Sequence, residues 1–178
     1  MKFWFSADLH LHHANIINLC DRPFKDIEDM DNKLIVNWNS RVRSEDTIFH
    51  LGDFCYKNDG RSFKEYYKRL NGTKIFIKGN HDGNNGVRTP ILDITIHHGG
   101  NTLLLLHNPS DISYTTSILV LCGHVHNAWK YHREYYSFGE HDSGYTDFCN
   151  VGVDMWGYHP ISINEIFNGY EKWKLGQI

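Results

Sequence analysis

In the segment KFWFSADLH, residues 2–10, a short apolar and aromatic run ends in polar side chains. The run Lys2–Ser6 is typical of a buried β-strand, and Asp8 and His10 follow it. The same order returns four more times, as Thr47–Leu51 before Asp53, Thr73–Lys78 before Asn80, Thr102–Leu106 before His107, and Ile118–Cys122 before His124 and His126. Ligands gather at the carboxyl ends of strands in open α/β sheets, so these runs predict one common site.

The side chains that follow the strands share one chemistry. They are carboxylates, an amide and imidazoles, which suit divalent metals such as Mn, Fe, Zn, Co or Ni. In the pairs Asp8-x-His10 and His124-x-His126, alternate residues of an extended segment would point the same way and grip one cluster. A single catalytic zinc takes about three protein ligands. Seven candidates therefore predict two ions: Asp8, His10, Asp53, Asn80, His107, His124 and His126.

Helices are predicted between the early strands. Apolar residues of segment 26–43 recur at spacings of three and four, which predicts a helix. A second helix is expected from Phe63 to Leu70, and Ser162 with Glu165 forms a capping-box pattern that opens a C-terminal helix. Helices among the first strands and hairpins later favour an α/β layered architecture with a mixed sheet.

The later strands carry weaker signals. Leu92–His98 and Thr102–His107 flank a glycine turn and predict a hairpin. Thr146–Val153 and Tyr158–Ile163 are weaker strand candidates, and the aromatic run Trp129–Tyr136 is expected to pack on the sheet.

Length and composition limit the function. A chain of 178 residues is expected to form a single domain, 1–178. Eighteen Lys and Arg against 21 Asp and Glu give a net charge of −3, which argues against a broad nucleic-acid surface and leaves nucleic acid as a substrate only. No apolar run approaches the length of a membrane span or signal peptide, so we expect a cytoplasmic protein without an obligate protein partner. The four cysteines form no CxxC pair and are expected to be reduced.

Five short motifs carry a resemblance to a known family. DLH at 8–10, GD at 52–53, GNHD at 79–82, His107 and GHVH at 123–126 resemble the calcineurin-like metallophosphoesterases, in particular a compact bacterial and phage subgroup. The resemblance implies a two-layer mixed β-sandwich flanked by helices, in four layers αββα, with two divalent metal ions. Manganese is favoured, and Fe, Zn, Ni or Co are alternatives.

The resemblance also implies a role for each motif residue. Asp8, His10 and His126 would hold one metal, Asn80, His107 and His124 the other, and Asp53 would bridge both. The reaction would be hydrolysis of a small phosphorylated substrate by in-line attack of a metal-bridging hydroxide. His81 would act as general acid or transition-state stabiliser, with its ring oriented by Asp82.

Several residues outside the motifs have open roles. Arg22 could clamp a phosphate and His13 could contact substrate, although an ordinary surface or salt-bridge role is an equal alternative for each. A structural turn role is preferred for Asn150 and Asp154. His50 is expected within a strand, with its ring hydrogen-bonded.

The function also has alternatives. A phosphodiesterase is favoured over a phosphomonoesterase because His81 is retained for a poor leaving group and no recognition insertion is evident. A non-catalytic binding scaffold is the second alternative, disfavoured because no ligand position is substituted. A metal-dependent TIM barrel would need roughly 200 or more residues and eight βα units, which this chain lacks.

Overall fold

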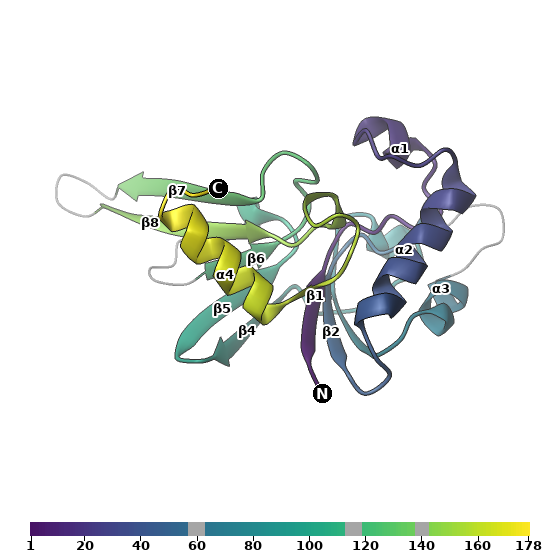
Figure 1. Ribbon diagram of the computed structural model, residues 1–178, viewed down its shortest axis with the longest axis horizontal. Helices are drawn as coiled ribbons and strands as arrows, with labels where there is room; N and C mark the ends of the chain where they lie inside the picture. The colour runs from purple at the N-terminus through teal and green to yellow at the C-terminus, as the bar shows by residue number, and fades with distance from the viewer. Residues whose placement is uncertain (57–62, 113–118, 138–142) are drawn as a thin grey trace.

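Two β-sheets lie at the centre of the computed structural model, which describes residues 1–56, 63–112, 119–137 and 143–178 (Figure 1). The first sheet has the order β3-β2-β1-β9 and the second β4-β5-β6-β8-β7. The strands are β1 (Phe3–Ser6), β2 (Thr47–Leu51), β3 (Thr73–Ile77), β4 (Asp93–His98), β5 (Asn101–Leu106), β6 (Leu119–Cys122), β7 (Tyr131–Ser137), β8 (Ser143–Asn150) and β9 (Ile161–Ser162). The helices are α1 (Asn15–Leu19), α2 (Ile27–Arg41), α3 (Phe63–Arg69) and α4 (Ile163–Lys174).

The central strands of both sheets are parallel, which decides where the following loops lie. β1, β2 and β3 run parallel, and so do β5, β6 and β8. In the first sheet the last residues of neighbouring strands pair with each other or within one residue: Ser6 pairs with His50, and Leu51 pairs with Ile77. The segments after these strands therefore start at one edge of each sheet.

The outer face of the first sheet is covered by α2 and α3. Trp4 and Ile48 of the sheet belong to one buried cluster with Leu34 and Trp38 of α2 and Tyr66 of α3. The spacing of four between Leu34 and Trp38 puts both on the helix face that meets the sheet. The N-terminus of α2 is capped by Asp26, whose side chain accepts the N–H of Asp29. The helix predicted over 26–43 is thus confirmed, with slightly shorter bounds.

A second core joins the facing sides of the two sheets. Phe5 and Leu51 of the first sheet are buried with Leu105 and Leu121 of the second. α4 packs on this same core through Ile166 and lies across the second sheet in Figure 1, where Tyr131 of β7 donates to the carbonyl of Ile166 at 3.2 Å. On the opposite face of the second sheet, the partly buried residues that pack on Val120 and Phe148 include Ile112 and Trp129 from loops. The predicted β-sandwich flanked by helices is confirmed.

Some elements differ from their predictions. Helix α1 and strand β7 were not predicted; the aromatic run that was expected only to pack forms the antiparallel edge strand β7. β8 begins at Ser143 and ends at Asn150, and β9 spans Ile161 and Ser162 alone. Residue 118, the first of the predicted run Ile118–Cys122, lies outside the described residues. The capping box of Ser162 and Glu165 is confirmed.

Two composition-based expectations can be compared with the structure. All four cysteines are free and buried, as expected for small apolar fillers. Within the described ranges, the longest helix is α2, with 15 residues, and none is long and apolar enough to cross a membrane.

Candidate metal centre

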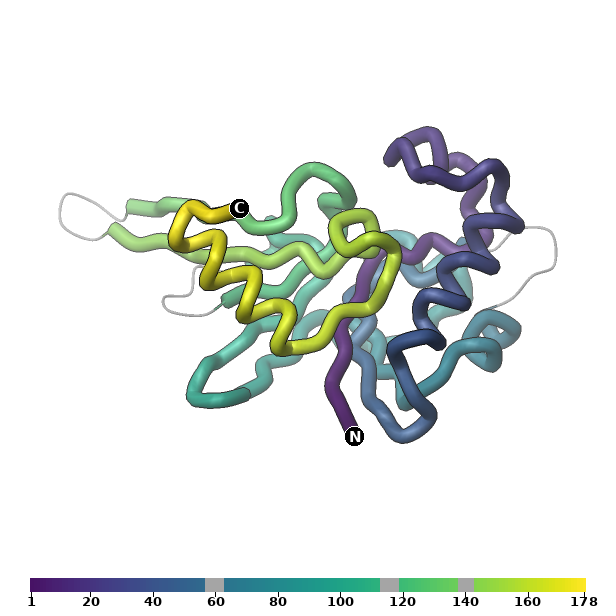
Figure 2. Tube along the Cα trace, viewed as in Figure 1, coloured from purple at the N-terminus to yellow at the C-terminus, as the bar shows by residue number. Residues whose placement is uncertain are grey.

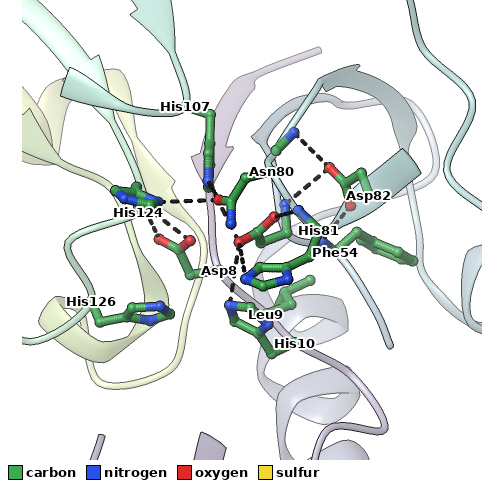
Figure 3. A network of polar contacts seen from close by, with 12 residues as sticks. Asp8, Leu9, His10, Phe54, Asn80, His81, Asp82, His107, His124 and His126 are labelled. Carbon is green, nitrogen blue, oxygen red and sulfur yellow. Dashed lines mark hydrogen bonds and ion pairs between the residues drawn. The ribbon is translucent and has the colours of Figure 1, made fainter. Parts of the chain in front are cut away.

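The side chains that follow the parallel strands lie together in one site (Figure 3). Asp8 and His10 come after β1 and Asn80 after β3, whereas His107 and His124 come after β5 and β6 of the other sheet. Both carboxylate oxygens of Asp8 accept the backbone N–H of His124, at 2.9 and 3.1 Å. Because these residues belong to different sheets, the site lies at the seam of the sandwich.

The backbone of this site is in a strained conformation. Five of the eight non-glycine residues with positive φ in the described part of the chain belong to it: Asp8 (55°), His10 (49°), Asp53 (58°), His124 (70°) and His126 (48°). A left-handed non-glycine residue costs about 1–3 kcal/mol, and such residues concentrate at functional sites. The segments Asp8-x-His10 and His124-x-His126 are therefore not extended, contrary to expectation: β1 ends at Ser6, and left-handed turns aim these side chains.

Asp53 lies between two histidines at the middle of the site. Its Oδ2 lies 3.6 Å from His10 Nε2 and 3.5 Å from His107 Nε2, and its side chain is 2% exposed. Burial alone would raise its pKa, but the hydrogen bond and charge of His107 and the N–H of His81 hold that pKa below its usual range. Asp53 is therefore an ionised carboxylate placed to be shared by two cations.

Asn80, His107 and His124 form the first group of donors. Asn80 Oδ1 lies 2.8 Å from His107 Nε2 and 3.1 Å from His124 Nδ1. Nδ1 of His107 lies 2.7 Å from the carbonyl of Leu51, so a hydrogen on Nδ1 leaves Nε2 for a metal. Burial lowers the pKa of His107, but Asp53 and Asp8 outweigh it and raise that pKa to about 9. The His107 ring therefore carries a positive charge beside Asp53 and Asp8 when no metal is bound, and a bound cation would replace that charge.

Asp8, His10 and His126 form the second group, with ligand atoms within 4.8 Å of one another. Asp8 is fully buried, and this burial raises its pKa to about 6. His10 Nε2 is also buried and has no hydrogen-bond partner among the described residues. A buried orphan nitrogen costs about 1–3 kcal/mol, which a metal ion would relieve.

The loops around these donors have no room for larger residues. A Cβ on Gly79 would lie 2.2 Å from Asp53 Oδ1, and one on Gly52, whose φ is +90°, would lie 2.5 Å from His107 Nδ1. The orphan nitrogen, the close glycine contacts and the oxygen and nitrogen donors together fit two divalent cations.

His81 and Asp82 have separate surroundings. The His81 side chain is 51% exposed, and its Nε2 lies 3.9 Å from Asp53 Oδ2. Asp82 is buried and accepts the backbone N–H groups of Asp53, Phe54 and Gly79 at 2.8–3.0 Å. These contacts differ from the predicted orienting role: Asp82 joins the loops after β2 and β3.

Arg22 is not placed to clamp a substrate phosphate. Its side chain is fully buried and makes a bidentate ion pair with Asp154, from Nε at 2.8 Å and from Nη2 at 2.9 Å. It also donates to the carbonyls of Asp8 and Leu9. Asp154, for which a turn role was preferred, is thus half of a buried ion pair, and sequence reasoning missed it because 132 positions separate the partners.

The remaining candidates lie around the site. The ring of His13 stacks on Tyr56 with centroids 4.6 Å apart and lies 5.4 Å from the ring of His10, so it remains a candidate substrate contact. Asn150 is buried and donates to the carbonyls of His126 and Trp129, in agreement with its expected structural role. His50 lies in β2, but its buried ring nitrogens have no hydrogen-bond partner in the described part, contrary to expectation.

Comparisons with known proteins agree with this geometry. A family model described as the calcineurin-like phosphoesterase superfamily domain matches residues 1–153. An uncharacterized protein of Methanocaldococcus jannaschii is 36% identical over 177 residues, covering 98% of this chain and 94% of that protein. The gene 66 protein of Mycobacterium phage L5 is 36% identical over 85 residues, covering 45% and 39% respectively. A crystal structure of a protein of unknown function from Aquifex aeolicus has a TM-score of 0.66 and 26% identity, covering 94% of this chain and 98% of that chain. The chain therefore belongs to the calcineurin-like phosphoesterase superfamily.

Proposed function

We propose that the chain is a two-metal phosphoesterase that hydrolyses a small phosphorylated substrate. Asp8, His10 and His126 would hold one cation, Asn80, His107 and His124 the other, and Asp53 would be shared. The observation that supports this most strongly is the position of the Asp53 carboxylate, 3.6 Å from a nitrogen of one group and 3.5 Å from a nitrogen of the other. A single carboxylate between two donor groups is the arrangement that a dinuclear site needs.

The chain's own residues would position the substrate and supply a proton. When bound, two cations provide a water nucleophile at neutral pH and neutralise charge on the phosphoryl oxygens. His81 stands at the exposed edge of the site, where its imidazole can donate a proton to the leaving oxygen. Asp53 fixes this residue by accepting its backbone N–H at 3.0 Å.

A diester substrate, manganese and a cytoplasmic location belong to the same proposal. The half-exposed ring of His81 supports a site open enough for a phosphate with two substituents. Hydrolysis of an alkyl diester breaks one P–O bond and expels an alkoxide, a poor leaving group that benefits from a general acid more than a good leaving group does.

The proposal is tested by replacing the shared carboxylate. Purified wild-type protein and Asp53→Asn are compared for manganese content and for hydrolysis of bis(p-nitrophenyl) phosphate and p-nitrophenyl phosphate, with Asp93→Asn, an exposed residue on β4, as control. We expect two metals and faster diester hydrolysis in the wild type and the control, and loss of both metals and turnover in Asp53→Asn.

Other results would change the conclusion in distinct ways. Equal metal content in the wild type and Asp53→Asn would contradict the dinuclear site. Faster hydrolysis of the monoester would replace the diesterase by a phosphomonoesterase. Metal binding without hydrolysis of either ester would favour a binding scaffold.

A further inference from the structure

The buried ion pair of Arg22 and Asp154 lies directly behind one part of the candidate metal centre. Arg22 comes from the segment between α1 and α2, and Asp154 from the 3-10 turn Val153–Met155 after β8. Figure 2 shows that this late segment returns beside the segment that follows β1, and the N–H of Val153 donates to the carbonyl of Ala7 at 3.1 Å. The pair thus connects an early and a late segment of the chain at the site.

The guanidinium of Arg22 supports the backbone that carries Asp8 and His10. Nη2 donates to the carbonyl of Asp8 at 2.7 Å, and Nη1 donates to the carbonyl of Leu9 at 2.9 Å. Both Asp8 and His10 have positive φ, a conformation that needs support from its surroundings. These two hydrogen bonds fix the peptide groups between the two ligands.

The carboxylate of Asp154 faces the third member of the same group. Its Oδ2 lies 3.5 Å from Nδ1 of His126, so a hydrogen on Nδ1 would face Asp154 and Nε2 would be left for a cation. Metal-bound histidines commonly have a carboxylate on their other ring nitrogen, which fixes the tautomer and the ring orientation. Both oxygens of Asp154 already accept hydrogen bonds from Arg22, which makes this carboxylate an orienting group rather than a ligand.

Arg22 and Asp154 contact only one of the two donor groups. Among the donor segments, Arg22 and Asp154 contact Asp8, Leu9 and His126, all in or beside the group Asp8, His10 and His126. In the other group, His107 is oriented by the carbonyl of Leu51, and Asn80 lies against His107 and His124. Arg22 and Asp154 therefore support one group only, and the two groups meet where the Asp8 carboxylate accepts the N–H of His124.

From this arrangement we propose that Arg22 and Asp154 are positioning residues that set the affinity of one metal site, formed by Asp8, His10 and His126, independently of the other. This inference rests on the proposed two-metal function. Loss of such an outer contact costs about 10–100-fold in metal affinity. Replacing Arg22 or Asp154 should therefore lower the metal affinity of one of the two sites. General destabilisation of the fold would not lower the affinity of one site alone.

The test is calorimetric titration of metal-free protein with manganese. Asp154→Asn removes the charge that pairs with Arg22 and faces His126. The matched control is Asp147→Asn, because Asp147 is 2% exposed and also makes a bidentate pair, with Arg133 at 2.6 and 2.7 Å on strands β7 and β8. We expect one manganese site of Asp154→Asn to weaken about 10–100-fold while the second keeps its wild-type affinity, and both sites to be unchanged in the control.

A second variant and the wild type make the outcome decisive. Arg22→Lys cannot form the bidentate pair, so it should weaken the same single site, and it replaces Asp154→Asn if that variant does not fold. Two unchanged sites, or two sites weakened equally, would overturn the proposal, and so would insolubility of both variants, which would assign the pair to the fold. If the wild type itself binds no manganese, the proposed function fails first, and this result is distinguishable from the others.

Discussion

Burial gives similar side chains of this protein different chemistry. His107 is buried against two carboxylates, which raise its pKa to about 9, whereas the pKa of His10 is lowered well below its usual value by desolvation. His50 is buried among the rings of Trp38, Phe54 and Phe76, with no hydrogen bond to its nitrogens from the described residues. The role of each histidine therefore follows from its neighbours and not from its residue type.

His81 is the residue whose replacement should separate metal binding from catalysis. We expect His81→Ala to keep both metals, because the side chain lies at the exposed edge, and to lower kcat by about 10²–10⁴-fold through loss of the general acid. Metal analysis and turnover of a diester with an alkoxide leaving group measure the two effects, with His98→Ala, an exposed residue on β4, as control. Full activity in His81→Ala would rule out its catalytic role.

His50 should make the fold sensitive to acid. Burial lowers its pKa from 6.5 to about 3, so the folded protein keeps the ring neutral while the unfolded chain binds a proton below about pH 6.5. The contribution of His50 to the free energy of unfolding is thus complete above that pH and falls by roughly 1 kcal/mol per pH unit on acidification towards pH 3.

Urea unfolding of metal-free wild type and His50→Phe between pH 4 and pH 7.5 checks this sign. Phe suits the aromatic surroundings and cannot titrate, so its advantage over the wild type should grow as the pH falls. A constant difference between the two proteins across this range would contradict the account.

The sequence predicts the donors of the centre better than the residues that support them. Asp8, Asp53 and Asn80 follow recognisable strands, and the parallel ends of those strands bring them together. For Arg22 a salt bridge was one of two equal alternatives, but its partner Asp154, 132 positions away, leaves no spacing pattern in the sequence. Asp82 was assigned a different role, because a set of backbone N–H groups leaves no such pattern either.

The loops that follow β2 and β3 of the first sheet are joined by the buried carboxylate of Asp82. Asp82 accepts N–H groups of Asp53 and Phe54 after β2, and of Gly79 after β3. β2 has the predicted bounds, Thr47–Leu51, because its apolar run ends at a glycine. β7 was not predicted as a strand, since its residues YHREYYS do not alternate regularly between apolar and polar and only Tyr131 is buried; pairing with β8 forms it.

Asp82→Ala should destabilise the fold rather than only slow the reaction. The substitution leaves three buried N–H groups without an acceptor, at about 1–3 kcal/mol each, so we expect a loss of about 3 kcal/mol or more. Urea unfolding of the metal-free variant measures it, with Asp93→Ala as control. Unchanged stability together with lower turnover would instead restore the predicted role of orienting His81.

At the scale of the whole molecule, the candidate metal ligands of one site come from both sheets. Loops after β1, β2 and β3 meet loops after β5 and β6, and the core between the sheets holds them at the seam. The resemblance of the five motifs to calcineurin-like phosphoesterases predicted this convergence, and the family is confirmed. The antiparallel pairing of β9 with β1 was not predictable, because two residues carry too little pattern.

Metal ions should therefore stabilise the sandwich as a unit. Ligand at 100 times its dissociation constant adds about 2.7 kcal/mol to the free energy of unfolding per site. We expect manganese to raise the unfolding temperature of the wild type, EDTA to reverse the rise, and Asp53→Asn to show neither effect. An equal rise in Asp53→Asn would place the stabilising metal elsewhere on the molecule.

The most direct test of the two-metal centre is a crystal structure of the manganese-loaded protein with anomalous scattering. We expect two peaks, about 3.5–4 Å apart, on either side of the Asp53 carboxylate, with Asp8, His10 and His126 around one and Asn80, His107 and His124 around the other. A single peak, or peaks away from Asp53, would contradict the two-metal centre.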